Sequence, residues 1–440
     1  MMSSNNKPTH YLLQSVNTGQ QFSDTGWTLD APGEKVDTLI RAVYEEVQLD
    51  VKDASLGVFR FADWLPVTRF LKGSSAPATY KSKGLAEYLG LENLYITFSG
   101  YWPEKGVTMR TCSFKETEAY TVGGRITEDT QGTLVVASAG NTARAFARVC
   151  SDNNIPLLLC VPEDNLDALW FDEPINDNVK LICTRSGSDY FDAIHLSNKI
   201  SCMPGFFPEG GARNIARRDG MGTTVLSAVH FIGKIPDYYF QAVGSGTGAV
   251  AAWEAIDRLI VDGRFGRNQM KLMVSQNAPF LAIYDAWKAN SRQMLPLDDD
   301  VARHQVEEIT AKVLSNRKPA YPIIGGLFDC LKNTDGDVLK ATNAEADEAA
   351  RLFEELEGND IHPAAAVATA TLIKEAKEGR IPKDAIVMLN ITGGGEKLFK
   401  KENKYHYLQP NHVFDISTSM DEIKKVMKAL FPAINPVGCK

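Results

Sequence analysis

Residues 133–150 read TLVVASAGNTARAFARVC, and this stretch decides the fold. The apolar run 133–137 has the composition of a buried strand, and 143–150 carries apolar residues at helical spacing, with a turn at Gly140 between them. A helix N-terminus directly after a strand offers free backbone N–H groups, which suit a carboxylate, and Asn141 adds a neutral donor. This combination suits an amino acid bound beside an aromatic hydroxyl. The alternative interpretation is a structural corner in which Asn141 only caps the helix.

The alternation of strands and helices continues along the chain. Further strands are expected at 94–98, 156–161, 179–184, 238–243, 270–275 and 385–391, with helices between them, for example at 189–203 and 249–260. This order is typical of α/β proteins with parallel sheets. Residues 11–54 predict a small N-terminal domain with an amphipathic run at 36–47, and the charged region 298–358 predicts a helical, solvated cover.

Composition narrows the classes of function. The chain has 440 residues, and its net charge of −8 argues against a nucleic-acid partner. No apolar stretch is long enough to span a bilayer and the first ten residues lack the apolar core of a signal peptide, so we expect no membrane partner and a cytoplasmic protein. The seven cysteines are scattered, which indicates neither a metal site nor a disulfide framework.

A second loop, residues 244–248 (GSGTG), lies between the strand-like run 238–243 and a helical run from 249. Alternating glycines let backbone N–H groups converge on one anion, and two hydroxyls and the following helix N-terminus add to the site. No Gly-Lys-Ser/Thr follows, so the loop is not a Walker motif, and its third glycine comes too early for a dinucleotide fingerprint. The predicted phosphate-binding residues are Gly244, Ser245, Gly246, Thr247 and Gly248.

Lys115 is the candidate for covalent chemistry. Ser113 and Glu116 have the spacing of a capping box, which predicts a helix that begins at Ser113 and carries Lys115 in its first turn. The positive end of a helix disfavours the ammonium form, and a lysine with a lowered pKa is available as a nucleophile. A solvated surface lysine is the alternative interpretation.

A third loop, residues 389–395 (LNITGGG), follows the apolar run 385–389. Such a strand end can be a plain turn. Together with the other motifs, Thr392 becomes a candidate partner for a pyridine nitrogen. A hydroxyl there leaves the ring nitrogen largely unprotonated, which favours β-elimination and replacement.

The order of Lys115, Asn141, the glycine loop and Thr392 resembles the fold-type II pyridoxal phosphate enzymes, the tryptophan synthase β family. The connector 57–66 (GVFRFADWLP) and residues 80–94 resemble threonine synthase. The motifs FSGYWPEKG (98–106), TCSFKE (111–116), PEGGARN (208–214) and FQAVGSGTG (240–248) are similar to those of the cysteate synthases, which are threonine synthase relatives. The similarity covers about residues 57–400.

The resemblance implies two parallel-sheet α/β domains with pyridoxal 5'-phosphate between them, plus a small N-terminal domain. The implied division is 1–56 for the N-terminal domain, 57–110 for the first part of the large domain, 111–225 for the smaller α/β domain with Lys115 and the Asn141 loop, and 226–440 for the rest of the large domain. Residues 11–32 contain no cysteine pair, so a metal-stabilised N-terminal knuckle is not expected. We also expect a homo-oligomer.

The implied reaction converts O-phospho-L-serine and sulfite to L-cysteate and phosphate. In it Lys115 would hold the cofactor and act as general base, Asn141 would hydrogen-bond the cofactor's ring oxygen, and Thr392 would face the ring nitrogen. The substrate carboxylate would lie on the N–H groups of Ser138, Ala139, Gly140 and Thr142. Two anionic substrates require a basic cluster in an acidic protein. The candidates are Lys105, Arg110, Arg144, Arg213, Arg217 and Arg218.

Three other functions compete with this interpretation. Threonine synthase, which uses O-phosphohomoserine, shares the scaffold, but its short lysine motif is replaced here by the longer segment 101–115. A nicotinamide oxidoreductase would need an acidic ribose ligand near Ser275, where none stands. A non-catalytic binding protein would be expected to lose Lys115. The fate of any cysteate, in coenzyme M or a sulfonolipid, stays open.

Overall fold

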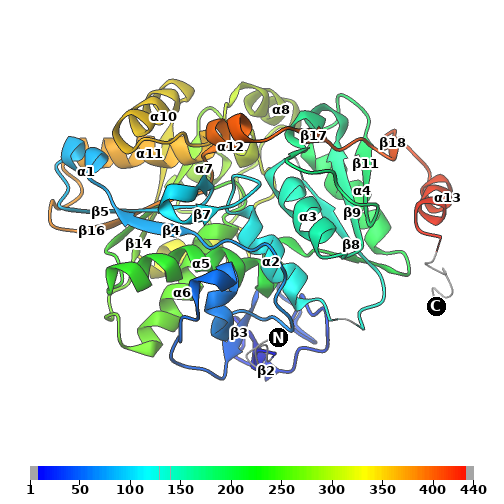
Figure 1. Ribbon diagram of the computed structural model, residues 1–440, viewed down its shortest axis with the longest axis horizontal. Coiled ribbons are helices and arrows are strands. Elements are labelled where there is room, and N and C mark those ends of the chain that lie inside the picture. The colour runs from blue at the N-terminus through cyan, green and yellow to red at the C-terminus, as the bar shows by residue number, and fades with distance from the viewer. Residues whose placement is uncertain (1–7, 128, 139, 433–440) are drawn as a thin grey trace.

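The computed structural model describes residues 8–127, 129–138 and 140–432. Its larger sheet has six strands in the order β15-β14-β13-β16-β5-β4. Four of them, β14, β16, β5 and β4, are labelled in Figure 1. All neighbours run parallel except β4, which is antiparallel to β5. The strands are β4 (Ala78–Lys81), β5 (Asn93–Phe98), β13 (Tyr238–Ala242), β14 (Lys271–Asn277), β15 (Asp337–Ala341) and β16 (Ile386–Ile391).

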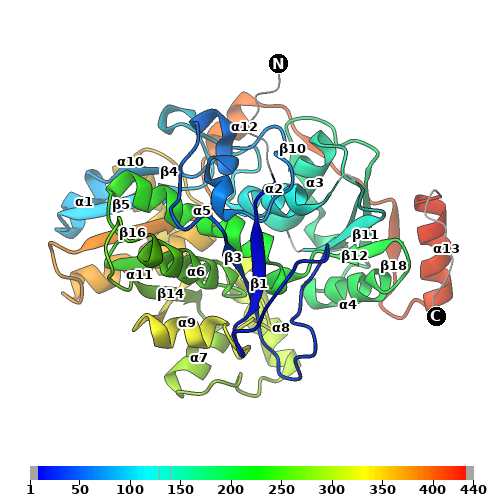
Figure 2. The ribbon, with the colours of Figure 1, turned by 90° about the horizontal axis from the view of Figure 1, so that it is seen from below.

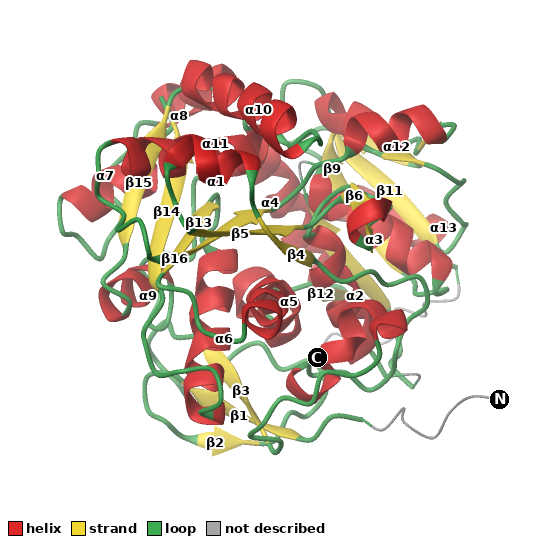
Figure 3. Cartoon of the chain, turned by 60° about the vertical axis from the view of Figure 1, so that its left-hand side comes forward, coloured by secondary structure: helices red, strands yellow, loops and turns green. Residues whose placement is uncertain are grey.

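Alternate side chains of this sheet point into two separate cores. Tyr239 of β13 belongs to the core with helices α5 (Ile215–Ile232) and α6 (Thr247–Asp262). Its neighbour Phe240 belongs to the core with α10 (Asn343–Glu357) and α11 (Pro363–Lys377). The two-residue period of a strand produces this division. Figure 3 shows α10 and α11 on one side of the sheet and α5 and α6 on the other.

The smaller sheet has five parallel strands in the order β12-β8-β9-β11-β18. Helix α3 (Asn141–Asp152) covers one face and α2 (Lys115–Arg125) packs against α3, while α4 (Tyr190–Ser201) and α13 (Met420–Leu430) cover the other face. The view in Figure 2 shows α13 beside β18 at the end of the molecule away from the larger sheet. The strands are β8 (Thr133–Ala137), β9 (Leu157–Pro162), β11 (Val179–Thr184), β12 (Phe206–Pro208) and β18 (His412–Phe414).

Smaller elements connect and cover the two sheets. Strands β1 (Tyr11–Ser15), β2 (Gln21–Phe22) and β3 (Ile40–Tyr44) form a three-stranded antiparallel sheet, so the amphipathic run 36–47 contains a strand. The short strand pairs are β6 (Tyr101–Trp102) with β7 (Val107–Thr108) and β10 (Trp170–Phe171) with β17 (His406–Tyr407). The remaining helices are α1 (Gly84–Leu89), α7 (Ala282–Lys288), α8 (Asp299–Glu308), α9 (Leu327–Asn333) and α12 (Glu396–Glu402). The 3-10 helices are η1 (Ala54–Trp64), η2 (Pro103–Lys105), η3 (Glu163–Ala168), η4 (Gly211–Arg213) and η5 (Lys312–Leu314).

The end of the chain corrects the expected domain division. Strand β18 pairs with β11, and Ile423 and Met427 of α13 are buried in the core of the smaller sheet. The chain therefore returns to the smaller region after about residue 406, instead of staying in the large domain from 226 to 440. Helix α5 also runs continuously through the expected boundary at residue 225.

Region 298–358 was expected to be a solvated helical cover, but it also contributes a strand and buried side chains to the larger domain. Its strand β15 lies at the edge of the larger sheet, and Tyr321, Leu327, Leu331 and Val338 are fully buried. Strand β15 is five residues long and reads DVLKA, a pattern too short and too polar to stand out from the surrounding helices. The seven strands expected from the sequence are all confirmed, within two residues at each end.

None of the helices in the described ranges is long and apolar enough to cross a membrane.

Candidate active site

The segment before Lys115 lies against the loop that carries Thr392. Ser113 forms an antiparallel bridge with Gly393, and the Phe114 N–H donates to the Thr392 carbonyl over 3.0 Å. Helix α2 begins at Lys115 itself, two residues later than the capping-box spacing predicts. The Ser113 hydroxyl accepts from the Lys115 N–H at 3.2 Å. Backbone pairing thus holds the lysine next to the Thr392 loop.

The glycine loop reaches the same end of the larger sheet. Strands β13 and β16 are parallel neighbours, so the loop after β13 and Thr392 after β16 leave the sheet at one edge. Phe114 also packs with Ala251 in the second turn of α6, the helix that follows the glycine loop. The sequence motifs around Lys115, Gly244–Gly248 and Thr392 therefore come together as expected.

The geometry of the glycine loop requires its glycines. Gly246 has φ +82°, and a Cβ there would lie 2.8 Å from Leu327 Cδ2. A Cβ on Gly244 would lie 2.9 Å from the Val313 carbonyl oxygen. The Ser245 and Thr247 hydroxyls lie 2.8 Å apart at the N-terminus of α6, whose first N–H groups have no partner within the helix. This set of hydroxyl and N–H donors fits a phosphate monoester such as that of pyridoxal phosphate.

The turn at Asn141 is joined to the lysine segment through Arg144. Helix α3 begins at Asn141 with Gly140 as its N-cap, and Ser138 and Thr142 are nearly buried. The Arg144 guanidinium donates to the Asn141 side-chain oxygen (3.0 Å) and to the carbonyls of Thr111 (3.0 Å) and Ala168 (2.8 Å). Because the Asn141 oxygen is taken, its NH₂ group is the part free to donate to a ring oxygen.

Of the expected substrate-site residues, Ala139 lies outside the described residues. The other three, Ser138, Gly140 and Thr142, surround the start of α3 as predicted, and the Gly140 N–H donates to the Ser138 hydroxyl at 3.1 Å.

Burial lowers the pKa of the Lys115 ammonium below its ordinary value, and the nearby Arg217 lowers it further. The carboxylate of Glu118 acts in the opposite direction, since its Oε2 lies 3.2 Å from Lys115 Nζ. A lysine at the start of a helix, with a depressed pKa and a ring face 4.8 Å away on Phe114, suits attachment to an aldehyde.

Arg110 does not fit the anion-binding role expected for it. Its guanidinium donates to Asp172 (2.6 Å), Glu173 (2.7 Å) and Asp152 (3.0 Å), which neutralise its charge and use its donors. Lys105 is exposed, and its ammonium lies over the rings of Tyr80 and Trp102. The insertion 101–115 forms the β6–β7 hairpin rather than an anion pocket.

Two further candidate cations, Arg213 and Arg218, are engaged with residues distant from Lys115 in sequence. Arg213 pairs with Asp30 and Asp37, and Arg218 is fully buried against Glu254. Arg144 and Arg217 are the two candidates that contact residues of the lysine segment or of α2.

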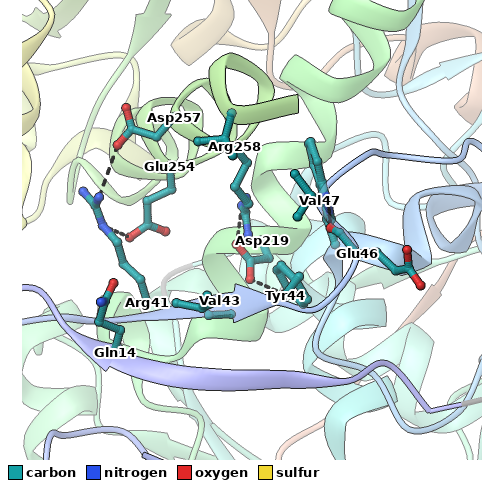
Figure 4. Close-up of a pocket in the computed structure, with 13 residues that line it drawn as sticks. Gln14, Arg41, Val43, Tyr44, Glu46, Val47, Asp219, Glu254, Asp257 and Arg258 are labelled. Atoms are coloured by element: carbon teal, nitrogen blue, oxygen red, sulfur yellow. Dashed lines mark hydrogen bonds and ion pairs between the residues drawn. The ribbon is translucent and has the colours of Figure 1, made fainter. Parts of the chain in front are cut away.

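A cavity of about 260 Å³ lies between β3, α5 and α6 (Figure 4). Ion pairs between Arg41 and Glu254 (3.3 Å) and between Arg258 and Asp219 (2.6 Å) line it. None of its lining residues belongs to the loops around Lys115, Asn141, the glycine loop or Thr392. The described residues also contain no cluster of histidine, cysteine and carboxylate side chains that could hold a metal ion.

The chain is similar in sequence to known pyridoxal phosphate enzymes. The family model described as "Pyridoxal-phosphate dependent enzyme" matches residues 103–393. The cysteate synthase of Methanosarcina barkeri is 48% identical over 94% of this chain and 99% of its own length. The chain belongs to the cysteate synthase family. Cysteate synthases of Methanosarcina mazei and Methanocorpusculum labreanum, both 47% identical, cover 88% and 89% of this chain and 94% of their own lengths.

Solved structures of pyridoxal phosphate enzymes share the fold of this cysteate synthase family member. Maize serine racemase has a TM-score of 0.54 at 13% identity and covers 74% of this chain and 91% of its own. Tomato threonine deaminase isoform 2 has a TM-score of 0.53 at 16% identity, with 74% and 87% covered. At these identities the likeness concerns the fold, which is that of the fold-type II enzymes with pyridoxal phosphate as cofactor.

Near Lys115, the sequence interpretation missed Glu118 altogether and missed the internal contacts of Arg144. Glu118 looks like one of many helix carboxylates, although its position three residues after the lysine places both on one helix face. Arg144 was considered only as an anion ligand. Its link between Asn141 and Thr111 depends on tertiary packing, and no sequence pattern reports it.

Proposed function

We propose that this protein is a cysteate synthase that replaces the phosphate of O-phospho-L-serine with sulfite and releases L-cysteate and phosphate. The observation that supports this most directly is the backbone pairing of the Lys115 segment with the Thr392 loop, in a chain 48% identical to the M. barkeri enzyme. Bound pyridoxal 5'-phosphate would accept the electron pair of the broken Cα–H bond.

We assign the roles as follows. Lys115 attaches the cofactor and, once freed by the substrate amine, removes the α-proton as general base. The glycine loop at the N-terminus of α6 holds the cofactor phosphate, Thr392 faces the ring nitrogen and Asn141 donates to the ring oxygen. The start of α3, with Ser138, Ala139, Gly140 and Thr142, receives the substrate carboxylate.

Arg144 is the cation that we assign to the anionic substrates. Its hydrogen bonds all go to neutral oxygens, and in the described part of the chain its guanidinium forms no ion pair within 4.0 Å, although the carboxylate of Glu396 acts on it from a greater distance. Its charge is therefore available to the O-phosphoserine carboxylate or phosphate and to sulfite beside Asn141.

A panel of substrates tests the function. Purified protein receives O-phosphoserine or O-phosphohomoserine, each with and without sulfite, while phosphate and amino-acid products are measured. We expect cysteate only with O-phosphoserine and sulfite together. Faster formation of threonine from O-phosphohomoserine and water would make the protein a threonine synthase instead.

The glycine loop has its own test. Gly246→Asp should lose the cofactor, because a carboxylate repels the phosphate and the new side chain meets Leu327. Gly233→Asp is the matched control, since Gly233 has a similar φ of +76° but ends α5 with open space around it. Cofactor affinity is read from absorbance, and folding from thermal melting. Equal affinity in both variants would remove the loop from the cofactor site.

We also propose that the protein works in the cytoplasm as a homo-oligomer. The six cysteines within the described ranges are unpaired, as a reducing compartment requires. Val43, Val47 and Val261 are among the residues that line the cavity and are 37%, 54% and 70% exposed, so they offer apolar surface that a second subunit would cover. Light scattering on the purified protein gives its mass in solution, and the mass of a monomer would contradict the proposed homo-oligomer.

A further inference from the structure

Glu118 places a buried carboxylate beside the reactive amine. It lies on α2 three residues after Lys115, its Oε2 is 3.2 Å from Lys115 Nζ, and its side chain has no exposed surface. Its other oxygen, Oε1, is buried without a hydrogen bond in the described structure. Within the described residues, the Glu118 carboxylate thus accepts its hydrogen bond from Lys115 Nζ.

Arg217 and Glu209 hold Glu118 from the opposite side. Arg217 of α5 brings its NH2 group to 3.1 Å from Glu118 Oε1, and its NH1 group donates to Glu209 at 2.5 Å. The phenol of the half-buried Tyr190, at the start of α4, interacts electrostatically with Arg217, Glu209 and Glu118. The groups around Lys115 are therefore two carboxylates, one guanidinium and one phenol, so that with the lysine the cluster has no net charge.

A purely structural role does not account for this arrangement. A carboxylate taken from water into the protein interior is costly unless its oxygens are paired and hydrogen-bonded. If the only role of Glu118 were a salt bridge with Arg217, both carboxylate oxygens could accept hydrogen bonds from the guanidinium. Instead one oxygen is turned to Nζ, the atom that receives and returns a proton in the reaction.

We propose that Glu118 is a catalytic residue that stabilises the ammonium form of Lys115, an inference that rests on the proposed function. Arg217 is then a positioning residue that holds Glu118 in place. When the α-proton moves to Nζ, the Cα–H bond breaks and its electron pair passes to the bound cofactor. The C–O bond to phosphate then breaks and its electron pair leaves with the phosphate, while the pair from the Cα–H bond forms a Cα–Cβ double bond.

The second half of the exchange returns the proton. A lone pair on the sulfite sulfur forms the new C–S bond at the β-carbon, and the proton on Nζ moves back to the α-carbon. Lys115 ends with the proton count with which it began, and no proton is transferred to Glu118. Its carboxylate supplies the counter-charge while Nζ carries the extra proton, in a site where burial otherwise disfavours a cation.

The test compares Glu118→Gln with Glu116→Gln in the full-length holoenzyme. Glu116 is also buried on α2, but it accepts from the Thr111 N–H, a bond that glutamine can keep. The first measurement is the visible absorbance of the bound cofactor against pH, which reports protonation of the nitrogen that Lys115 contributes. Loss of the facing carboxylate should lower that pKa by about one unit or more, and Glu116→Gln should not move it.

The second measurement is the kinetics with O-phosphoserine and α-deuterated O-phosphoserine. In Glu118→Gln we expect kcat to fall by about 10- to 100-fold, with KM for O-phosphoserine within about threefold and a larger isotope effect. Glu118→Asp keeps the charge and should recover part of both the pKa and kcat. It also keeps the proposal testable if the glutamine variant does not fold.

An absorbance titration that is unchanged in Glu118→Gln, or shifted equally in Glu116→Gln, would overturn the inference. So would wild-type kcat in Glu118→Gln. The proposed function fails separately, if the wild-type protein makes no cysteate or if borohydride links the cofactor to another lysine.

Discussion

Two arginine–carboxylate clusters contain residues of the lysine segment or of α2, and they differ in what their charges face. In one, Arg217 holds Glu118 and Glu209, and Glu118 turns an oxygen towards Lys115. In the other, Arg110 pairs with Asp152, Asp172 and Glu173, and within the described residues it forms no ion pair with a residue of the site. The sequence interpretation named Arg110 and Arg217 alike as candidate anion ligands, and Arg110 is the one that stands closer to Lys115 in the chain. Distance along the chain is a poor guide to which cation shares a buried space with a reactive group.

Lys115→Ala should have the largest effect of all. It removes the attachment point and the general base, so we expect cysteate formation to fall by about 10⁴-fold or more. The protein should lose the absorbance of covalently bound cofactor. The Arg110 cluster is not touched, so thermal stability of the cofactor-free protein should stay close to that of the wild type. Activity of the alanine variant near the wild-type level would move the catalytic centre elsewhere.

Arg217→Gln should damage both stability and catalysis. It leaves Glu118 and Glu209 buried without their shared cation, which costs about 3–5 kcal/mol of unfolding free energy. Because the guanidinium lowers the pKa of Lys115, its removal should raise that pKa, and the acidic limb of the rate profile should move to higher pH. This direction is opposite to that expected for Glu118→Gln. An unchanged unfolding free energy in Arg217→Gln would contradict the assigned cluster.

Arg110→Gln should affect stability alone. The cluster is partly exposed, so solvent screening limits the loss of unfolding free energy to about 1–2 kcal/mol. KM for O-phosphoserine and for sulfite should stay within about twofold of wild type. Urea denaturation and initial-rate kinetics on the same preparation give both values. A large rise in either KM would restore Arg110 as an anion ligand and weaken the contrast between the two clusters.

Glu116 lies in the first turn of α2. The substitution Glu116→Gln should have the smallest effect, a change in unfolding free energy that depends on pH. Burial raises the pKa of its carboxyl from the ordinary 4.5 to about 7. The folded state therefore favours the protonated form, so stability is fully present below pH 4.5 and falls as pH rises towards about 7. The Glu116→Gln variant has no carboxyl group at this position, so its stability does not fall in this way as pH rises. The difference in unfolding free energy between wild type and variant should grow in favour of the variant across that range and be flat above it.

Strong local patterns in the sequence predicted most of the fold. The strands at 133–137 and 179–184 are found with the predicted bounds, because continuous apolar runs between turns mark buried parallel strands. The loop motifs at Asn141, 244–248 and Thr392 follow their strands as predicted. Strand β18 and the return of α13 to the smaller sheet were missed, because a three-residue strand has no periodicity and its partner β11 lies far away in the sequence.

The sequence by itself determined the chemistry that the chain can carry: a lysine at a helix start, a glycine loop before α6, a hydroxyl after β16 and a turn at Asn141. Each of these depends on neighbours in the chain, so local propensities and turn geometry are sufficient to find them. Only the tertiary structure decided which charges meet. Ion pairs in the interior depend on which helix faces are packed together, and that is how Glu118 comes to lie between Lys115 and Arg217 while Arg110 is neutralised elsewhere.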